Sequence, residues 1–271
     1  MTTPILEDGS TGSHELPGQD EELLHGGKVM PVTEHLSELR SRIIRSIWAV
    51  VILSGLCFYF SQELILFLKE PLSRSVPKAY NSLHFTGPMD VFLTDIKVSL
   101  LGGVLLACPV WIYQFWRFFE PALYPRERRY ILPFIIASIA FFALGLLFCF
   151  EIALPMALEY LIGVGLEVGT PIITITDYTH LVIMMLLGFG LVFETPVILV
   201  LLALLDIVNL AMLTGSRRVV LVVILIIAAI VTPSPDPLSQ IVLAVPMYAM
   251  YELAIFVIRK IEKHRAKSAL P

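Results

Sequence analysis

Long apolar runs recur along the chain and are separated by shorter polar segments. We assign six hydrophobic segments, at residues 43–60, 91–119, 130–158, 178–205, 219–231 and 238–258. At about 1.5 Å per residue, the first four are long enough to cross a hydrocarbon core of about 30 Å as helices. The runs lack the period-two alternation of transmembrane strands. The pattern therefore predicts an all-α polytopic membrane protein with six transmembrane helices.

The last two segments are expected to be short. Residues 219–231 would form a helix of only roughly 20 Å, and the proline-rich connector TPSPDPLSQ (232–240) follows directly. Either the bilayer is thinner at this point or the two segments form a short hairpin. Both arrangements return the chain to the side from which it came. In the longest predicted outer loop, ELILFLKEPL (63–72) predicts a short amphipathic helix.

Lysine and arginine lie mostly on one side of this predicted topology. Membrane proteins concentrate basic residues in their cytoplasmic loops, so both chain ends are predicted to be cytoplasmic. The opposite side carries only Lys69, Arg74, Lys78 and Lys97. The basic residues on the predicted cytoplasmic side are Lys28, Arg40, Arg42, Arg45, Arg117, Arg126, Arg128, Arg129, Arg217, Arg218, Arg259, Lys260, Lys263, Arg265 and Lys267.

Composition supports a membrane protein and divides the chain into three parts. Hydrophobic residues make up 57% of the 271 residues and charged residues only 15%, which is rare for a soluble domain. Residues 1–30 are acidic and contain Gly, Ser and Pro, which predicts a disordered cytoplasmic tail and not a signal peptide. Residues 31–260 form the predicted membrane domain, and residues 261–271 a basic cytoplasmic C-tail.

The sequence offers little for catalysis or cofactor binding. It contains no HExxH, GxSxG or P-loop motif. Cys57, Cys108 and Cys149 are far apart within apolar runs, so we interpret them as small core residues. The basic residues follow membrane topology and do not indicate nucleic-acid binding. We therefore expect no enzyme, no cofactor, no metal ion and no nucleic-acid partner.

The stretch TEHLSELRSRIIRSI (33–47) has a helical pattern that leads into the first span. Apolar residues recur on one face, and a polar stripe made of His35, Glu38, Arg42 and Arg45 recurs on another. Glu38 and Arg42 are four residues apart, which is the spacing of an ordinary surface ion pair worth a few tenths of a kcal/mol. From spacing alone, that ion pair is the simpler interpretation.

Glu194 lies near the middle of the fourth segment, with no cation beside it in sequence. An ionisable residue at this depth costs a few kcal/mol and usually faces protein or water. Such a residue can also carry protons, so a proton-coupled secondary transporter of small solutes is the alternative function. Lys97 and Glu151 both lie near outer span ends, and a mutual ion pair is a further hypothesis.

Six short motifs, taken in order, resemble those of the TatC family, the polytopic subunit of the twin-arginine protein translocase. Any one of them is weak evidence, but together they occupy matching places among the spans across residues 31–260. They are HLSELRSR (35–42), EPL (70–72), YQFWRFFEPALYPRERR (113–129), FETP (193–196), TPSPDPLSQ (232–240) and AVPMYAMYE (244–252).

The resemblance implies a receptor in a protein-export complex. TatC proteins bind the twin-arginine signal peptides of folded substrates and work with single-span subunits of the TatA and TatB type. The proton-motive force drives export. The implied fold is a concave arrangement of six helices, the last two short. The implied setting is the cytoplasmic (inner) membrane of a prokaryote, with self-association in a multi-subunit complex and contact with membrane lipid.

The resemblance also assigns a signal-peptide site on the cytoplasmic side. Carboxylates suit two guanidiniums because arginine can bind each one bidentately, whereas lysine is a point charge. The residues that match the family pattern for this site are Glu38, Glu127, His35, Arg40, Arg42 and Phe118. For Glu127 the alternative is a solvated loop residue, and for Phe118 an interfacial anchor of the second span.

Three further residues match family positions linked to partner subunits: Glu194, Asp236 and Gln240. Glu194 either faces the concave side, where a partner helix or water would meet it, or is a buried acid hydrogen-bonded to a neighbouring span. Asp236 immediately precedes Pro237, a pairing typical of the N-cap and first residue of a helix. Capping is therefore the alternative role for Asp236.

Overall fold

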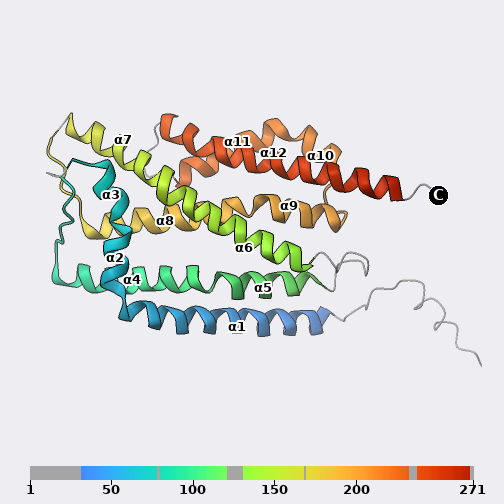
Figure 1. Cartoon of the computed structure of the whole chain (residues 1–271), viewed down its shortest axis with the longest axis horizontal. Helices are drawn as coiled ribbons and strands as arrows, with labels where there is room; N and C mark the ends of the chain where they lie inside the picture. The colour runs from blue at the N-terminus through green and yellow to red at the C-terminus, as the bar shows by residue number, and fades with distance from the viewer. Residues whose placement is uncertain (1–31, 78–79, 121–130, 168, 232–236, 269–271) are drawn as a thin grey trace, which may run out of the picture.

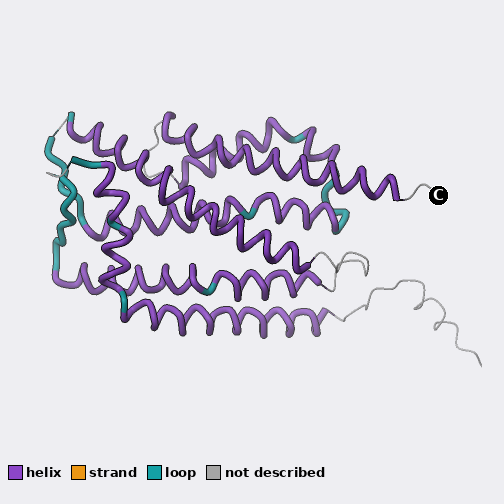
Figure 2. Tube along the Cα trace, viewed as in Figure 1, coloured by secondary structure: helices purple, strands orange, loops and turns teal. Residues whose placement is uncertain are grey.

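The computed structural model describes residues 32–77, 80–120, 131–167, 169–231 and 237–268. In these ranges the elements are helices, and the extended pairing is limited to an isolated bridge between His84 and Thr174. Most helices run along the long axis of the molecule, while two short ones cross one end (Figures 1 and 2). The all-α prediction is therefore confirmed. The predicted acidic tail, residues 1–30, lies outside the described residues and stays a prediction.

The first span is a single helix, α1 (Val32–Tyr59), which begins well before the apolar run. The second is a pair of helices, α4 (Pro88–Leu106) and α5 (Cys108–Phe119), bent by 52° relative to each other. Pro109 stands in the first turn of α5. Proline has no N–H and its ring clashes with the preceding turn, which accounts for the break.

The third and fourth segments are also interrupted. α6 (Ile131–Phe148) passes through a π-helical turn (Cys149–Ala153) into α7 (Leu154–Leu166). α8 (Ile175–Phe193) ends at Glu194, and α9 (Thr195–Leu204) begins with Pro196 in its first turn. α7 and α9 therefore each carry a proline in their first turn, as α5 does.

Two short helices, α2 (Ser61–Leu68) and α3 (Glu70–Ser75), cross one end of the bundle, where a single amphipathic helix was predicted. The hydroxyl of Tyr178 at the start of α8 donates a 2.6 Å hydrogen bond to the carbonyl of Leu68. Arg74 binds Glu151 at 2.9 Å and also Glu70. The predicted pair between Lys97 and Glu151 is therefore wrong, because α3 packs against α7 and brings Arg74 to that carboxylate.

The chain ends in a helical hairpin. α10 (Leu210–Gly215) leads into α11 (Arg217–Val231), which returns through α12 (Pro237–Ser268). The Gln240 side-chain amide donates a 2.7 Å hydrogen bond to the Leu225 carbonyl and joins the two arms. α11 has 15 residues, which is about 22 Å of helix. The fifth segment is therefore short, as predicted. The sixth helix, which was also predicted to be short, is not: α12 has 32 residues, because the helix continues beyond the apolar segment into the predicted C-tail.

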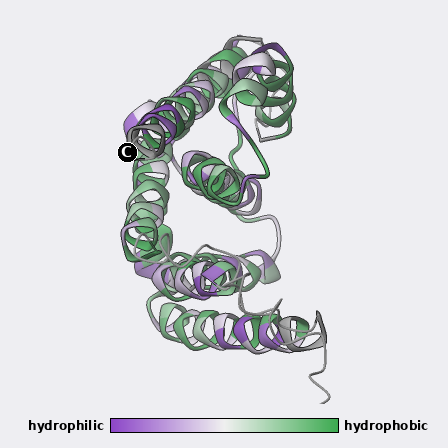
Figure 3. Ribbon diagram, turned by 90° about the vertical axis from the view of Figure 1, so that its right-hand side faces the viewer, coloured by the Kyte–Doolittle hydropathy of each residue, from purple (hydrophilic) through white to green (hydrophobic). Residues whose placement is uncertain are grey.

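Among the described residues, three helical stretches are long and apolar enough to span a membrane: Leu36–Tyr59, Ile131–Leu166 and Ile175–Leu204. The bent α4–α5 pair is a fourth if it is taken as one span. In the most apolar 18 residues of α1 only 6% are buried, whereas in the corresponding stretch of α8–α9 56% are buried. α1 is therefore peripheral and α8–α9 central. Seen along the long axis, the helices follow a curved path and do not close into a ring (Figure 3). This agrees with the predicted concave arrangement.

Candidate functional site

One end of the molecule collects the basic residues, and we call it the arginine-rich end. α1 and α6 begin there, and α5, α9 and α12 end there (Figure 1). Its described basic residues are Arg40, Arg42, Arg45, Arg117, Arg217, Arg218, Arg259, Lys260 and Lys263. The opposite end carries α2, α3 and the end of α7. The two ends therefore differ in charge as the sequence predicted.

Glu38 and Arg42 form an ion pair one helical turn apart on α1. Arg42 donates from both Nε, at 3.1 Å, and Nη2 to the same carboxylate oxygen, Oε1. Nη1 of Arg42 also lies 3.4 Å from Oε1 of Gln114 on α5. The Glu38 side chain keeps 27% of its surface exposed, and the Arg42 side chain 15%. Arg42 therefore orients Glu38 and contacts α5 through Gln114, and both of its bonds to Glu38 go to Oε1 and not to Oε2.

The end of α5 carries aromatic residues and a second ion pair. Arg117 binds Glu120, three residues on. The ring centroids of Phe118 and Phe119 are 5.3 Å apart, with the rings edge to face. The ring centroids of Phe119 and Phe115 are 4.9 Å apart. Phe118 is therefore part of an aromatic group at the arginine-rich end.

Some predicted residues of this site are not described. Glu127 lies in residues 121–130, outside the described ranges. His35 belongs to α1, but its side chain is not described, and Arg40 on the same helix is exposed. Both ends of the connection that contains Glu127 are described, since α5 ends at Phe119 and α6 begins at Ile131. The connection therefore starts and finishes at the arginine-rich end.

Glu194 is buried inside the bundle, with 7% of its surface exposed. The Ser138 hydroxyl on α6 lies close to its carboxylate. The Ser138 hydroxyl in turn accepts a 2.9 Å hydrogen bond from the indole Nε1 of Trp116 on α5. The other carboxylate oxygen, Oε1, is buried without a hydrogen-bond partner among the described residues. Glu194 is therefore a buried acid beside a neighbouring span, with one carboxylate oxygen that lacks a donor among the described residues.

Asp236 and Gln240 were also predicted to contact partner subunits, and of these two only Gln240 is described. It bonds the Leu225 carbonyl and is partly buried, so it joins α11 to α12. Asp236 lies in residues 232–236, outside the described ranges. Near the other end of this hairpin, Arg217 binds Glu252 at 2.9 Å, and the Tyr248 hydroxyl donates to the same carboxylate at 3.0 Å.

Residues 34–246 match the protein family described as Sec-independent protein translocase protein (TatC). The chain belongs to the TatC family. A TatC protein of Aquifex aeolicus (strain VF5) is 40% identical over 229 residues, which cover 84% of this chain and 94% of that protein. A TatC protein of Desulforapulum autotrophicum is 37% identical over 225 residues, which cover 83% of each.

Solved structures agree with the sequence match. A crystal structure described as twin arginine translocase receptor TatC superposes with a TM-score of 0.73 at 37% identity, covering 83% of this chain and 98% of that one. A second crystal structure, described as the same receptor in DDM, superposes with a TM-score of 0.74 at 38% identity and covers 83% of this chain and 99% of that one. The chain is therefore a multi-pass membrane subunit of a protein translocase and not an enzyme. The family prediction made from the motifs is confirmed, and a small-solute carrier is not favoured.

In this TatC family member, three side chains that the sequence did not single out complete the polar contacts. Gln114 approaches Arg42, and Trp116 donates to Ser138, whose hydroxyl lies close to Glu194. Gln114 and Trp116 are two residues apart, so helical spacing puts them on different faces of α5, but it does not specify which helices those faces meet. The helix breaks did have a signal in the prolines at 109, 155 and 196.

Proposed function

We propose that the chain is the receptor and core subunit of a twin-arginine translocase. It binds twin-arginine signal peptides of folded proteins at the arginine-rich end, which faces the cytoplasm together with both termini. It recruits single-span subunits of the TatA and TatB type and associates with further copies of itself. The proton-motive force drives export through this complex across the cytoplasmic membrane of a prokaryote.

The geometry of Glu38 is the observation that carries this proposal. Its carboxylate is oriented by Arg42 through one oxygen, while more than a quarter of the side chain stays exposed. An incoming guanidinium can bind Oε2 without displacing Arg42 from Oε1. A carboxylate binds arginine through short, charge-assisted hydrogen bonds, and Arg42 already makes such bonds to Glu38.

Glu127 supplies the second carboxylate in this proposal. The contact of Arg42 with Gln114 brings α1 against α5, and α5 leads into the connection that contains Glu127. A signal peptide with two adjacent arginines would then bind Glu38 with one and Glu127 with the other. His35, Arg40 and Phe118 line the same site, with Phe118 against the apolar part of the peptide.

Partner subunits are proposed to bind along the bundle and its hairpin, at Glu194, Asp236 and Gln240. The support for Gln240 is its position at the junction of α11 and α12, next to the connector that contains Asp236. The support for Glu194 is its unpartnered oxygen at a helix break in the central pair α8–α9. A carboxylate left without a partner at this depth is costly, so a donor from a partner helix would stabilise it.

The test is photo-crosslinking of a signal peptide to the full chain in its reconstituted complex. Peptides with two arginines and with two lysines are compared on the wild type, Glu38→Gln and Glu127→Gln. The wild type is expected to label with the arginine peptide about tenfold more strongly, because lysine cannot bind a carboxylate bidentately. Each variant is expected to lose most of this difference.

Glu63→Gln serves as the control, since Glu63 is an exposed carboxylate on α2 at the opposite end. It is expected to label as the wild type does. Equal labelling by both peptides in the wild type and in all three variants would contradict the proposed recognition of arginine pairs.

A further inference from the structure

Gln114 connects the second span to the proposed signal-peptide site. Helices α1 and α5 pack side by side (Figure 1). The side-chain oxygen of Gln114 on α5, Oε1, lies 3.4 Å from Nη1 of Arg42 on α1. Arg42 in turn binds Glu38 one turn earlier on the same helix. The three side chains therefore form a row that leads from α5 to the carboxylate proposed to bind a signal-peptide arginine.

Packing fixes the backbone of α5 on both sides of Gln114. Ile112 and Trp116, two residues before and after it, are each 2% exposed and belong to a core shared with α6 and α9. The indole Nε1 of Trp116 also donates a 2.9 Å hydrogen bond to the Ser138 hydroxyl on α6. Gln114 is itself partly buried. A fixed helix therefore presents its amide to α1.

The contact with Gln114 divides the donors of Arg42 between two acceptors. A guanidinium commonly binds a carboxylate through two N–H groups, one to each oxygen. Arg42 instead bonds Oε1 of Glu38 from both Nε and Nη2, while Nη1 faces Gln114. Nη1 and Nη2 together form the tip of the guanidinium, so the tip cannot bind both oxygens of Glu38 while Nη1 is held. Among the described residues, Oε2 of Glu38 accepts no hydrogen bond.

A neutral amide suits this position better than an apolar or an acidic side chain. The Arg42 side chain is only 15% exposed, so an Nη1 donor without an acceptor would be costly there. With an apolar residue at position 114, Oε2 of Glu38 is the acceptor that remains in the pair. A carboxylate at position 114 would compete with Glu38 for Arg42. Gln114 supplies an acceptor without adding charge.

We propose that Gln114 is a positioning residue of the signal-peptide site. By holding Nη1 of Arg42, it keeps Arg42 on one oxygen of Glu38 and leaves the other oxygen for an arginine of the signal peptide. Gln114 acts through Arg42 and is not itself an acceptor for the peptide. This role rests on the proposed function, in which Glu38 binds that arginine.

The test is photo-crosslinking of signal peptides to the full chain in its reconstituted complex, with either two arginines or two lysines in the peptide. Gln114→Met removes the acceptor and keeps a side chain of similar length and helix propensity. The ratio of arginine-peptide to lysine-peptide labelling is expected to fall about threefold or more, because Arg42 then occupies both oxygens of Glu38. A role in stability alone would weaken labelling by both peptides and leave their ratio unchanged.

Arg42→Lys shows whether the effect passes through Arg42. Lysine is a point charge without the two-pronged geometry of arginine, so it pairs with Glu38 without binding both oxygens in a fork. Arg42→Lys alone is expected to keep the ratio within about twofold of the wild type, and adding Gln114→Met is expected to change it by less than about 1.5-fold. A threefold fall on adding Gln114→Met, or loss of the preference in Arg42→Lys alone, would contradict this role.

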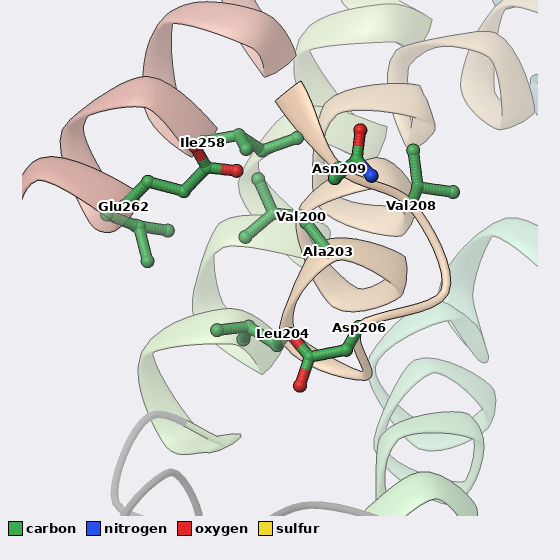
Figure 4. A pocket seen from close by; sticks show the side chains of 9 residues that line it. Val200, Ala203, Leu204, Asp206, Val208, Asn209, Ile258 and Glu262 are labelled. Carbon is green, nitrogen blue, oxygen red and sulfur yellow. The ribbon is translucent and has the colours of Figure 1, made fainter. Parts of the chain in front are cut away.

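Two control variants test for unspecific effects. Gln62→Met makes the same change at an exposed position on α2, at the opposite end. Glu262→Gln removes an exposed acid at the arginine-rich end, where Glu262 lines a cavity of about 300 Å³ between α9 and α12 (Figure 4). Glutamine there keeps an acceptor for the Leu210 amide, which bonds Glu262 at 3.2 Å. Both controls are expected to give the ratio of the wild type.

The outcomes separate this role from the proposed function. If the wild type labels equally with both peptides, the proposed function fails and the role of Gln114 fails with it. If the wild type prefers the arginine peptide and Gln114→Met keeps that preference, only the role of Gln114 is overturned. Gln114→Leu is a second apolar variant for the case that Gln114→Met does not fold, and it is expected to show the same fall in the ratio. Unfolding temperatures verify that each variant is folded.

Discussion

Gly103→Ala is expected to destabilise the bundle by forcing α1 away from α4. These two helices make the most extensive helix–helix contact in the described residues. A Cβ atom on Gly103 would lie 2.0 Å from Ser54 Oγ, 2.7 Å from Ser54 N and 2.8 Å from Ser54 Cα. A side-chain oxygen can rotate away, but the backbone atoms of α1 cannot. The helices must therefore separate by several tenths of an ångström or more.

The size of the effect follows from two opposing terms. Overpacking a close contact typically lowers the free energy of unfolding by about 1–3 kcal/mol. Because the added Cβ would meet backbone atoms, we place this case at about 3 kcal/mol. Alanine favours helix over glycine by about 1 kcal/mol. The free energy of unfolding is therefore expected to fall by about 2 kcal/mol. Ser54→Ala in the same chain removes only the Oγ contact, so it is expected to restore part of this loss.

The assay is reversible unfolding in bicelles, followed by steric trapping, with Gly55→Ala as the matched control. Gly103 lies on α4. Gly55 lies on α1, next to Ser54, and an added Cβ there meets no atom within 4 Å. Gly55→Ala is expected to be neutral or slightly stabilising, by up to about 1 kcal/mol. If Gly103→Ala proved as stable as Gly55→Ala, the close packing of α1 on α4 would not exist in the membrane.

Two further substitutions test buried hydrogen bonds. Tyr178→Phe leaves the Leu68 carbonyl without its donor and is expected to lower the free energy of unfolding by about 1–3 kcal/mol in the same assay. A change within a few tenths of a kcal/mol would show that the bond is absent. Trp116→Phe removes the donor to Ser138, and a double-mutant cycle with Ser138→Ala is expected to show coupling of at least about 0.5 kcal/mol. Strictly additive effects would argue against a direct bond between Trp116 and Ser138.

The position of the helices in sequence was predictable because it depends on local properties. A long apolar run needs a helix to satisfy its backbone in lipid, and its length sets whether it can span. The helices found in the structure overlap all six predicted segments, and α11 is short as expected. The interruptions within three of these segments follow from prolines whose effect is equally local.

The polar pairings were less predictable, because they depend on which helix faces meet. The Glu38–Arg42 pair has a helical spacing and was considered from the sequence, whereas the approach of Gln114 to Arg42 spans 72 residues. Glu151 pairs with Arg74 instead of Lys97, since the position of α3 decides which cation reaches it. Spacing within one helix carries no information about such contacts.

The sequence by itself determined the helical membrane architecture, the charge difference between its two ends and, through its motifs, the family. The burial of Glu194 and the pairing of Arg74 with Glu151 were decided only by the tertiary structure. The physical reason is the distance along the sequence over which each interaction acts. Hydrophobic length, proline breaks and charge bias act over a few turns of one helix, while a buried hydrogen bond or a cavity requires helices distant in sequence to pack in one particular register.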